Sequence, residues 1–252
     1  MRKTAEFSYE ILAAALIIIF TVLLCAEYLW LYVLSKKNEE TDIQKREINS
    51  RIHAMTEAFL YSPTASSRET ELTSLIEYIG DDPLKRDEAS VQLIQLIKRS
   101  EDIPPEKLRA LGRLYESLDP IEFYSKQLES GNYYEKSYAV RRLADFNASD
   151  KTEEIRKLLD DKHADVVYNA AMALSELGDM ESVLVFAQKC ENNRYYSHRV
   201  LLELFQTYSG DRAELVRRIF DERNDYIKAT CIKAYTSDRI KELAPLYADG
   251  MS

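Results

Sequence analysis

The stretch DVVYNAAMALSELGD, residues Asp165–Asp179, decides the fold predicted for this chain. Small and apolar residues fill a helix that ends in a Leu-x-x-Leu-Gly-Asp turn, Leu174–Asp179. Glycine just past the last periodic residue is a common signal for the end of a helix. A second helix is predicted directly after the turn, at residues 180–190. The stretch therefore predicts a helix, a tight turn and a second helix.

The same pattern returns every 31 residues, on both sides of this stretch. Three copies place Leu143, Leu174 and Phe205 in one apolar column, and a shortened fourth copy begins at Asp225. One helix pair cannot bury its apolar face alone, so successive pairs are expected to stack into an all-α solenoid. The other aligned positions are Val140, Ala171 and Leu202; Phe146, Leu177 and Tyr208; Asn147, Gly178 and Ser209; and, in the fourth copy, Ile227, Cys231 and Ala234. Second helices are predicted at residues 152–159, 180–190 and 212–220.

This unit resembles the HEAT repeat, in particular its short bacterial form, over about residues 132–222. The resemblance implies a scaffold or adaptor for protein–protein interaction with no activity of its own. Short HEAT-like repeats also occur in lyases that attach bilin chromophores, so a lyase is the alternative. The proline and arginine usual early in the first helix are absent, and Val167 and Tyr168 stand there. The resemblance rests on Asp165, Val166, Ala170, Ala171, Ala173, Leu174, Leu177, Gly178 and Asp179.

A long apolar stretch, Ile11–Leu34, precedes the helical region and is interrupted only by Thr21 and Glu27 as clearly polar positions. As a helix it measures roughly 36 Å, which exceeds the roughly 30 Å of a bilayer core. Aromatic residues flank it, as at membrane interfaces. The run is longer than the apolar region of a signal peptide and does not end in small residues. It is therefore predicted to be an uncleaved single-pass anchor in the cell membrane.

The basic residues around this anchor predict its orientation. Two lie before it and five come within about 20 residues after it, which favours a cytoplasmic location for the C-terminal part. Glu27 allows two interpretations. It pairs with a polar group of a transmembrane partner, or it reaches the interface beside the aromatic residues. The basic residues are Arg2 and Lys3 before the anchor, and Lys36, Lys37, Lys45, Arg46 and Arg51 after it.

Four segments are predicted: a transmembrane anchor (1–35), an amphipathic juxtamembrane helix (36–62), a degenerate helix-pair region (63–131) and HEAT-like repeats (132–252). The juxtamembrane helix is expected to dock on the helices that come after it in the chain, with a short coiled coil as the alternative. Its apolar face comprises Ile43, Ile48, Ile52, Met55 and Phe59. Capping boxes are predicted at Ser66–Glu69, Asp119–Glu122, Asp150–Glu153 and Asp211–Glu214.

Composition restricts the function classes. The net charge of −9 without a long basic run disfavours nucleic acid as a partner. Six glycines and six prolines are too few for a turn-rich β domain. Cys190 and Cys231 have no metal-ligand spacing and are interpreted as core residues. His53, His163 and His198 are far apart in the sequence, and no catalytic motif occurs. The chain is therefore predicted to have no enzymatic activity, no cofactor and no metal.

The candidate interaction residues are aromatic and basic. Tyrosine pairs recur two repeats apart, which would place them along one edge of the solenoid, where tyrosine and arginine are favoured as interface anchors. Alternatively, these tyrosines fill gaps between stacked repeats. The expected partner is a protein, in the sharper version an integral membrane enzyme or transporter that this chain serves as an accessory subunit. The candidates are Glu27, Tyr133, Tyr134, Arg141, Arg142, Arg194, Tyr195, Tyr196 and Arg199.

Overall fold

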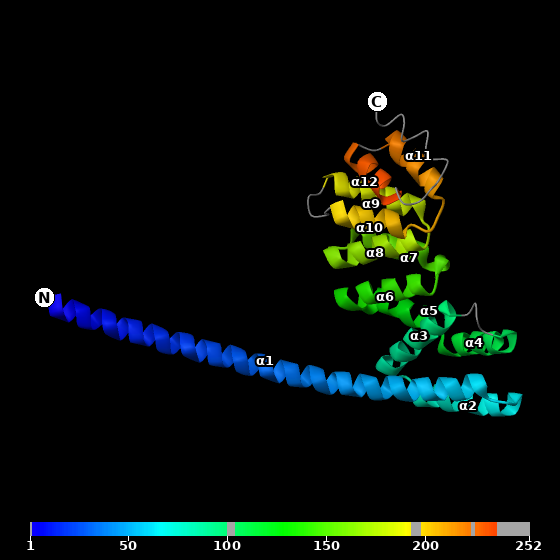
Figure 1. Ribbon diagram of the computed structural model, residues 1–252, viewed down its shortest axis with the longest axis horizontal. Helices are drawn as coiled ribbons and strands as arrows, with labels where there is room; N and C mark the ends of the chain where they lie inside the picture. The colour runs from blue at the N-terminus through cyan, green and yellow to red at the C-terminus, as the bar shows by residue number, and fades with distance from the viewer. Residues whose placement is uncertain (1, 100–103, 193–197, 223–224, 236–252) are drawn as a thin grey trace. The chain divides into compact units, whose positions relative to one another are not determined.

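The computed structural model describes residues 2–99, 104–192, 198–222 and 225–235, with side chains from residue 18 onward apart from 38, 191, 192 and 222. These residues form helices and turns without a strand, which confirms the all-α prediction (Figure 1). The chain divides into two compact units, Met1–Leu118 and Asp119–Ser252. The four predicted segments remain predictions.

The first unit is built around α1 (Arg2–Tyr61), a single helix of 60 residues. Helices α2 (Ala65–Ile79), α3 (Pro83–Lys98) and α4 (Pro105–Leu118) all contact it. In Figure 1 they gather at its C-terminal end. Ile52 and Phe59 are fully buried there, as their helical spacing predicted. Ile43 of the same predicted face is 50 % exposed, because it precedes the covered part of α1.

Polar contacts attach α1 to α3. The Gln92 side-chain amide donates to the backbone oxygen of Asn49 at 2.8 Å. The Asn49 amide in turn donates to a Glu88 carboxylate oxygen at 3.0 Å. Gln92 is 8 % exposed, so its hydrogen bond is formed in a largely dry contact and adds about 1 kcal/mol of net stability. The two helices therefore hold a defined register.

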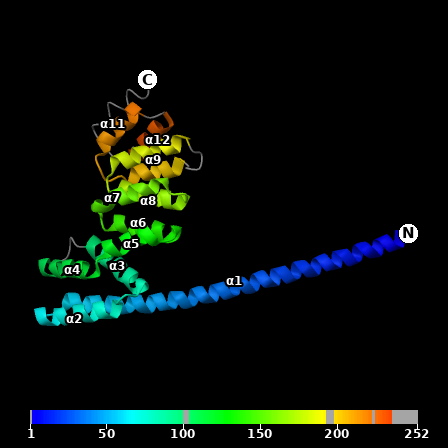
Figure 2. The ribbon, with the colours of Figure 1, turned by 180° about the vertical axis from the view of Figure 1, so that it is seen from behind.

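The second unit consists of helix pairs in chain order. The first helices are α6 (Tyr133–Asp145), α8 (Ala164–Glu176), α10 (His198–Thr207) and α12 (Asp225–Tyr235), and α5 (Pro120–Ser130) packs on α6. The second helices are α7 (Thr152–Lys157), continued by a 3₁₀ turn to Asp160, α9 (Met180–Asn192) and α11 (Arg212–Glu222). Both ribbon views show α6, α8 and α10 stacked in successive layers (Figures 1 and 2).

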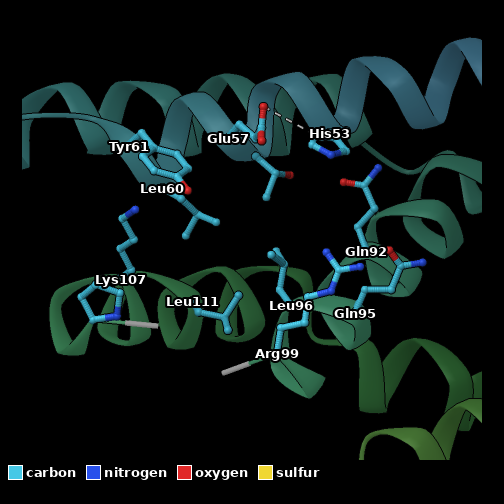
Figure 3. Close-up of a pocket in the computed structure, with 12 residues that line it drawn as sticks. His53, Glu57, Leu60, Tyr61, Gln92, Gln95, Leu96, Arg99, Lys107 and Leu111 are labelled. Atoms are coloured by element: carbon cyan, nitrogen blue, oxygen red, sulfur yellow. Dashed lines mark ion pairs between the residues drawn. The ribbon is translucent and has the colours of Figure 1, made fainter. Parts of the chain in front are cut away.

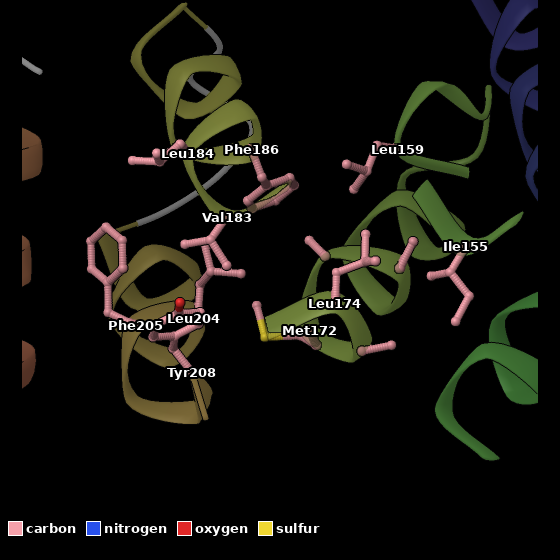
Figure 4. Close-up of a cluster of buried hydrophobic side chains, with 14 of the residues drawn as sticks. Ile155, Leu159, Met172, Leu174, Val183, Leu184, Phe186, Leu204, Phe205 and Tyr208 are labelled. Atoms are coloured by element: carbon pink, nitrogen blue, oxygen red, sulfur yellow. The ribbon is translucent and has the colours of Figure 1, made fainter. Parts of the chain in front are cut away.

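The predicted apolar columns form the core of this unit. Leu143, Leu174 and Phe205 are all fully buried. Figure 4 shows the last two of them among side chains contributed by three successive helix pairs. Cys231 of the fourth copy is fully buried too, and Cys190 is 8 % exposed. Val140, Ala171 and Tyr208 are buried as well, whereas Phe146, Leu177 and Leu202 of the predicted columns are half-buried and pack against this core.

Equivalent turns end α6 and α8. Asn147 and Gly178 have positive φ angles of 54° and 76°. After each, a backbone N–H donates back into the helix, from Ala148 to Leu143 at 3.0 Å and from Asp179 to Leu174 at 2.9 Å. This six-to-one bond with a left-handed residue is the Schellman motif. The repeat position occupied by Asn147 and Gly178 therefore requires a residue that tolerates the left-handed backbone conformation.

The third turn differs and forms a polar contact between repeats. The backbone N–H of Ser209 donates to the Ser175 carbonyl at 3.1 Å. The Ser175 hydroxyl, fully buried, donates to the Leu204 carbonyl at 2.6 Å. Thr207 donates to the Ser175 hydroxyl at 3.2 Å. Ser175 thus satisfies its polar groups across the α8–α10 contact.

Of the four predicted capping boxes, two are confirmed in the bond that the aspartate accepts, and two are wrong. Asp119 and Asp211 accept from the N–H groups of Glu122 and Glu214 at 3.4 and 3.0 Å. Helix α2 is instead capped by Thr64, which accepts from Ser67. Asp150 lies in a 3₁₀ turn, and α7 begins two residues later. A capping box that the sequence interpretation missed, Asn132 with Glu135, begins α6.

Candidate interaction surface

The first turn of α6 presents two of the predicted tyrosines. The Asn132 carboxamide oxygen accepts from the N–H of Tyr134 at 2.9 Å, and the Glu135 carboxylate accepts from the Asn132 N–H at 2.8 Å. This reciprocal cap fixes the helix start. Tyr133 is 51 % and Tyr134 70 % exposed. The sequence therefore places two aromatic rings at one edge of the second unit.

These two tyrosines have different surroundings. The Tyr133 ring stacks on the His163 ring, with centroids 4.7 Å apart and planes 18° from parallel. His163 immediately precedes α8, so Tyr133 contacts the neighbouring repeat with one side of its ring while about half of the residue stays exposed. Tyr134 presents most of its ring to solvent. Tyr134 thus fits the interaction-edge interpretation better than Tyr133.

The predicted arginines are also divided. Arg142 donates to the Tyr138 hydroxyl at 2.8 Å and pairs with Asp145 at 3.1 Å, so it is a structural residue of α6. Arg141 and Arg199 are exposed on α6 and α10. Arg194, Tyr195 and Tyr196 lie outside the described residues. Glu27 is exposed on α1, which belongs to the first unit.

A cleft that the sequence interpretation did not single out lies between α6, α8 and α10. Its volume is about 140 Å³. Carboxylates of Asp145, Glu176 and Glu203 line it, together with Arg141 and Tyr168. Burial raises the pKa of the Tyr168 hydroxyl, and a hydrogen bond to Glu203 raises it further, whereas the positive charges of Arg141 and Arg199 oppose the shift. Tyr168 therefore stays protonated between charges of both signs.

The 31-residue period could have identified this cleft. Arg141, Met172 and Glu203 are equivalent positions in three repeats, as are Asp145, Glu176 and Thr207, and all six line the cleft. The predicted columns use the period at apolar and turn positions, which do not include these six. Applied to the positions beside the buried columns, the period brings these six residues together, with Met172 buried and the other five at least partly exposed. The cleft is therefore a direct consequence of repeat stacking.

An ion pair connects successive second helices. Arg156 of α7 contacts Asp179 with Nη2 at 2.8 Å and Nε at 3.2 Å, just before α9 begins. Ser182 donates to the same carboxylate oxygen at 2.5 Å. The hydrogen bond to Asp179 raises the pKa of Arg156 above its usual value, and burial partly offsets this. This network stabilises the contact between successive repeats. Its charged groups are paired with one another, so we do not regard it as a ligand-binding site.

Within the described residues no group of three or more histidine, cysteine or acidic side chains could hold a metal ion. Cys190 and Cys231 are free thiols whose burial raises the pKa of each to about 12. Thiolates are the nucleophilic form, so burial disfavours the reactive form of both cysteines.

Residues 121–197 match the family model of HEAT repeats. The chain contains HEAT-like helical repeats. The match begins within α5 and covers α6 to α9, the helices that contribute most of the cleft. HEAT repeats are generally protein-interaction modules, which agrees with a protein partner. No curated protein matched the sequence. The match is to the repeat itself, so the bilin-lyase alternative remains an expectation from resemblance.

The apolar part of helix α1, in the first unit, is relevant to the predicted membrane anchor. Among the described residues, α1 is long and apolar enough to cross a membrane, and none of its apolar window is buried within the chain. Val22, Leu29 and Trp30 are between 62 and 65 % exposed. A helix in a soluble core would bury such side chains.

Proposed function

We propose that this protein is a membrane-tethered HEAT-repeat scaffold that holds a protein partner close to the membrane. The supporting observation is the continuity of α1, whose apolar part is exposed while its C-terminal part packs on α2 and α3. Each exposed apolar side chain on such a helix favours transfer out of water by about 25 cal/mol per Å². Insertion into lipid would bury this surface. Tethering then raises the local concentration of the repeats for a membrane-associated partner.

Membrane fractionation tests the tether. The full-length chain is expected in the membrane fraction after alkaline carbonate washing, and a variant lacking residues 1–35 in the soluble fraction. The intact mass of the membrane-bound chain distinguishes an anchor from a signal sequence, because a cleaved signal would remove the N-terminal residues. A soluble full-length chain, or one shortened at the N-terminus, would contradict the tether.

The partner is proposed to bind the surface formed by Tyr134, Arg141, Tyr168 and Arg199. Tyrosine and arginine contribute disproportionately to interface energy. In-cell crosslinking with the full-length chain should capture a discrete protein, and Arg141→Ala or Tyr134→Ala should reduce its yield several-fold. Arg217→Ala on α11 is the matched control, since Arg217 is exposed and pairs with Glu214 of its own helix. Equal yields from all variants would exclude this surface.

The accessory-subunit version depends on Glu27. If Glu27 pairs with a polar group of a transmembrane partner, Glu27→Leu should reduce co-purification of a polytopic protein in mild detergent. Thr21→Leu provides a control substitution in the same helix. If the glutamate only reaches the interface, both variants will behave like the original chain, and the repeats alone carry recognition.

A further inference from the structure

The chain passes from one compact unit to the other at a single residue. The first unit ends at Leu118, the last residue of α4, and the second begins at Asp119, directly before α5. Leu118 is 4 % exposed and Pro120 is buried, whereas Asp119 between them is exposed. Packing therefore holds the chain on either side of Asp119, and the connection is one residue long.

The backbone of Asp119 is in the left-handed conformation, with φ at 42° and ψ at 61°. This region is unfavourable for a residue that carries a Cβ, although aspartate and asparagine tolerate it better than other residues do. The residue before a proline is in addition pushed towards extended backbone. Two local preferences thus oppose the conformation that Asp119 adopts.

A helix that starts with Asp-Pro does not by itself require this conformation. Asp82 precedes Pro83 and caps α3 in the same way, yet its φ is −71° and its ψ is 112°. Thr64 and Asn132, which cap α2 and α6 with their side chains, are extended as well. Extended backbone is the usual conformation of a capping residue. What distinguishes Asp119 from these caps is its place between the two units.

A rotation about the N–Cα bond of Asp119 would turn one unit and leave the start of α5 unchanged. The side chain and the carbonyl group of Asp119 both lie on the α5 side of this bond. They accept from the N–H groups of Glu122 at 3.4 Å and Phe123 at 3.1 Å. With ψ kept at 61°, a φ of about −75° gives the backbone angles of an inverse γ-turn. Asp119 therefore has a second allowed state that retains both hydrogen bonds.

The helices on both sides of Asp119 are packed into their own units. Leu111 of α4 is 3 % exposed. Figure 3 shows it facing Leu60 of α1 across a pocket of about 440 Å³ that α1, α3 and α4 line. Tyr124 of α5 is fully buried, and its ring centroid lies 6.4 Å from that of Tyr138 in α6. A change of backbone angle at Asp119 is therefore transmitted to whole units.

We propose that Asp119 is a one-residue hinge that switches the repeat unit between two orientations relative to the α1 unit. In one state φ is positive, as described, and in the other it is negative. Hinges in proteins are a few loop or element-terminal residues that absorb a large change of φ or ψ. A partner that binds one orientation better shifts the population towards it. This inference does not depend on the proposed membrane tether.

Distances between the two units report the hinge state. Spin labels are attached to Glu77→Cys on α2 and Val185→Cys on α9, both exposed positions, in the full-length chain in mild detergent. Cys25 is exposed and is replaced by serine, whereas Cys190 and Cys231 are buried and stay unlabelled. Double electron–electron resonance then gives the distribution of distances between the labels.

Substitution of Asp119 should shift this distribution. Asp119→Thr keeps a side chain that can cap α5, but a β-branched residue strongly disfavours positive φ. It should transfer population from one distance to another by at least about fivefold, the ratio that corresponds to the cost of left-handed backbone. Asp119→Asn should keep the original distribution, because asparagine tolerates the same conformation.

Asp82→Thr is the matched control, since it makes the same change at the other Asp-Pro helix start, where φ is already negative. It should leave the distances between the units unchanged. Circular dichroism checks that each variant is folded. The same distribution in the original chain and in Asp119→Thr, or an equal shift in Asp82→Thr, would overturn the hinge.

Discussion

Gly178 and Asn147 occupy equivalent turn positions, and both have the left-handed backbone conformation. A Cβ at Gly178 would lie 3.2 Å from the Ser209 hydroxyl, which is closer than usual. Gly178→Ala should therefore lower the free energy of unfolding by about 1–2 kcal/mol, the cost of left-handed backbone for a residue with a Cβ. Urea denaturation measures the change.

Asparagine tolerates this conformation better than alanine does. Gly178→Asn should consequently cost less than Gly178→Ala, and Asn147→Gly should change stability by only a few tenths of a kcal/mol. Equal losses for the alanine and asparagine variants at 178 would show that crowding against Ser209, and not the backbone angle, determines the effect.

The buried thiols of Cys190 and Cys231 have pKa values raised to about 12. Burial favours the neutral thiol in the folded state, so this contribution is fully present below pH 9, the ordinary value. It is lost progressively as the pH rises from 9 towards 12, because the unfolded chain ionises first. At pH 7.5 a maleimide should label these cysteines only at the rate of unfolding. Cys25 is an exposed free thiol, so the label is located by peptide mass analysis; rapid labelling of Cys190 or Cys231 in native buffer, compared with a urea-unfolded sample, would contradict their burial.

At the scale of elements, the ion pair between Arg156 and Asp179 connects α7 to the start of α9. Arg156 is 39 % exposed in its side chain, so solvent screening reduces the interaction to about 1 kcal/mol. Asp179→Asn and Arg156→Gln should each lower the free energy of unfolding by about this amount. The double variant should cost less than the sum of the two. Strict additivity in urea denaturation would show that the pair contributes nothing as a pair.

Helix identity and the columns of the repeat could be predicted from sequence because both depend on periodic apolar residues. Cap positions were predicted less well, since they depend on backbone geometry that a motif does not contain. Ser66 fits a capping box, yet Thr64 caps α2, directly after Pro63. Asp150 fits one too, but the chain first forms a 3₁₀ turn and α7 begins at Thr152.

The candidate site was predicted in part, for a different physical reason. Tyr134 and Arg141 were identified because their residue types favour interfaces, and both are exposed. The cleft around Tyr168 depends on side chains from α6, α8 and α10, about 30 residues apart in the sequence, which only repeat stacking brings together. The pocket of the first unit has no repeat pattern and could not be predicted from single residues.

At the scale of the whole second unit, each repeat is expected to be stabilised by its contacts with the neighbouring repeats. Leu174 is fully buried in α8, which contacts both α6 and α10. Leu174→Ala should lower the free energy of unfolding by about 2–5 kcal/mol. Because each repeat is stabilised by its neighbours, amide hydrogen exchange should accelerate in α6 and α10 as well as in α8. Acceleration confined to α8 would contradict a shared core.

The control for this experiment is Val185→Ala on α9. Val185 is 44 % exposed, so its truncation should change stability by less than about 0.5 kcal/mol. A loss comparable to that of Leu174→Ala would indicate that position in the repeat, and not burial, governs the response.

Because α1 is one continuous helix, the rotation of its C-terminal part about the helix axis is fixed relative to its N-terminal part. Between Leu34 and Tyr61 the helix covers about 40 Å. Under the proposed tether it therefore sets the distance of its C-terminal end from the membrane and the rotation of that end about the helix axis. One alanine inserted after Thr41 turns the helices α2, α3 and α4, which pack on the C-terminal part of α1, by about 100° relative to the anchor, whereas seven inserted residues turn them by only about 20°. Capture of a membrane partner should fall with the single insertion and recover with seven. The helical phase of α1 would then decide which face of α2, α3 and α4 is turned towards a membrane partner.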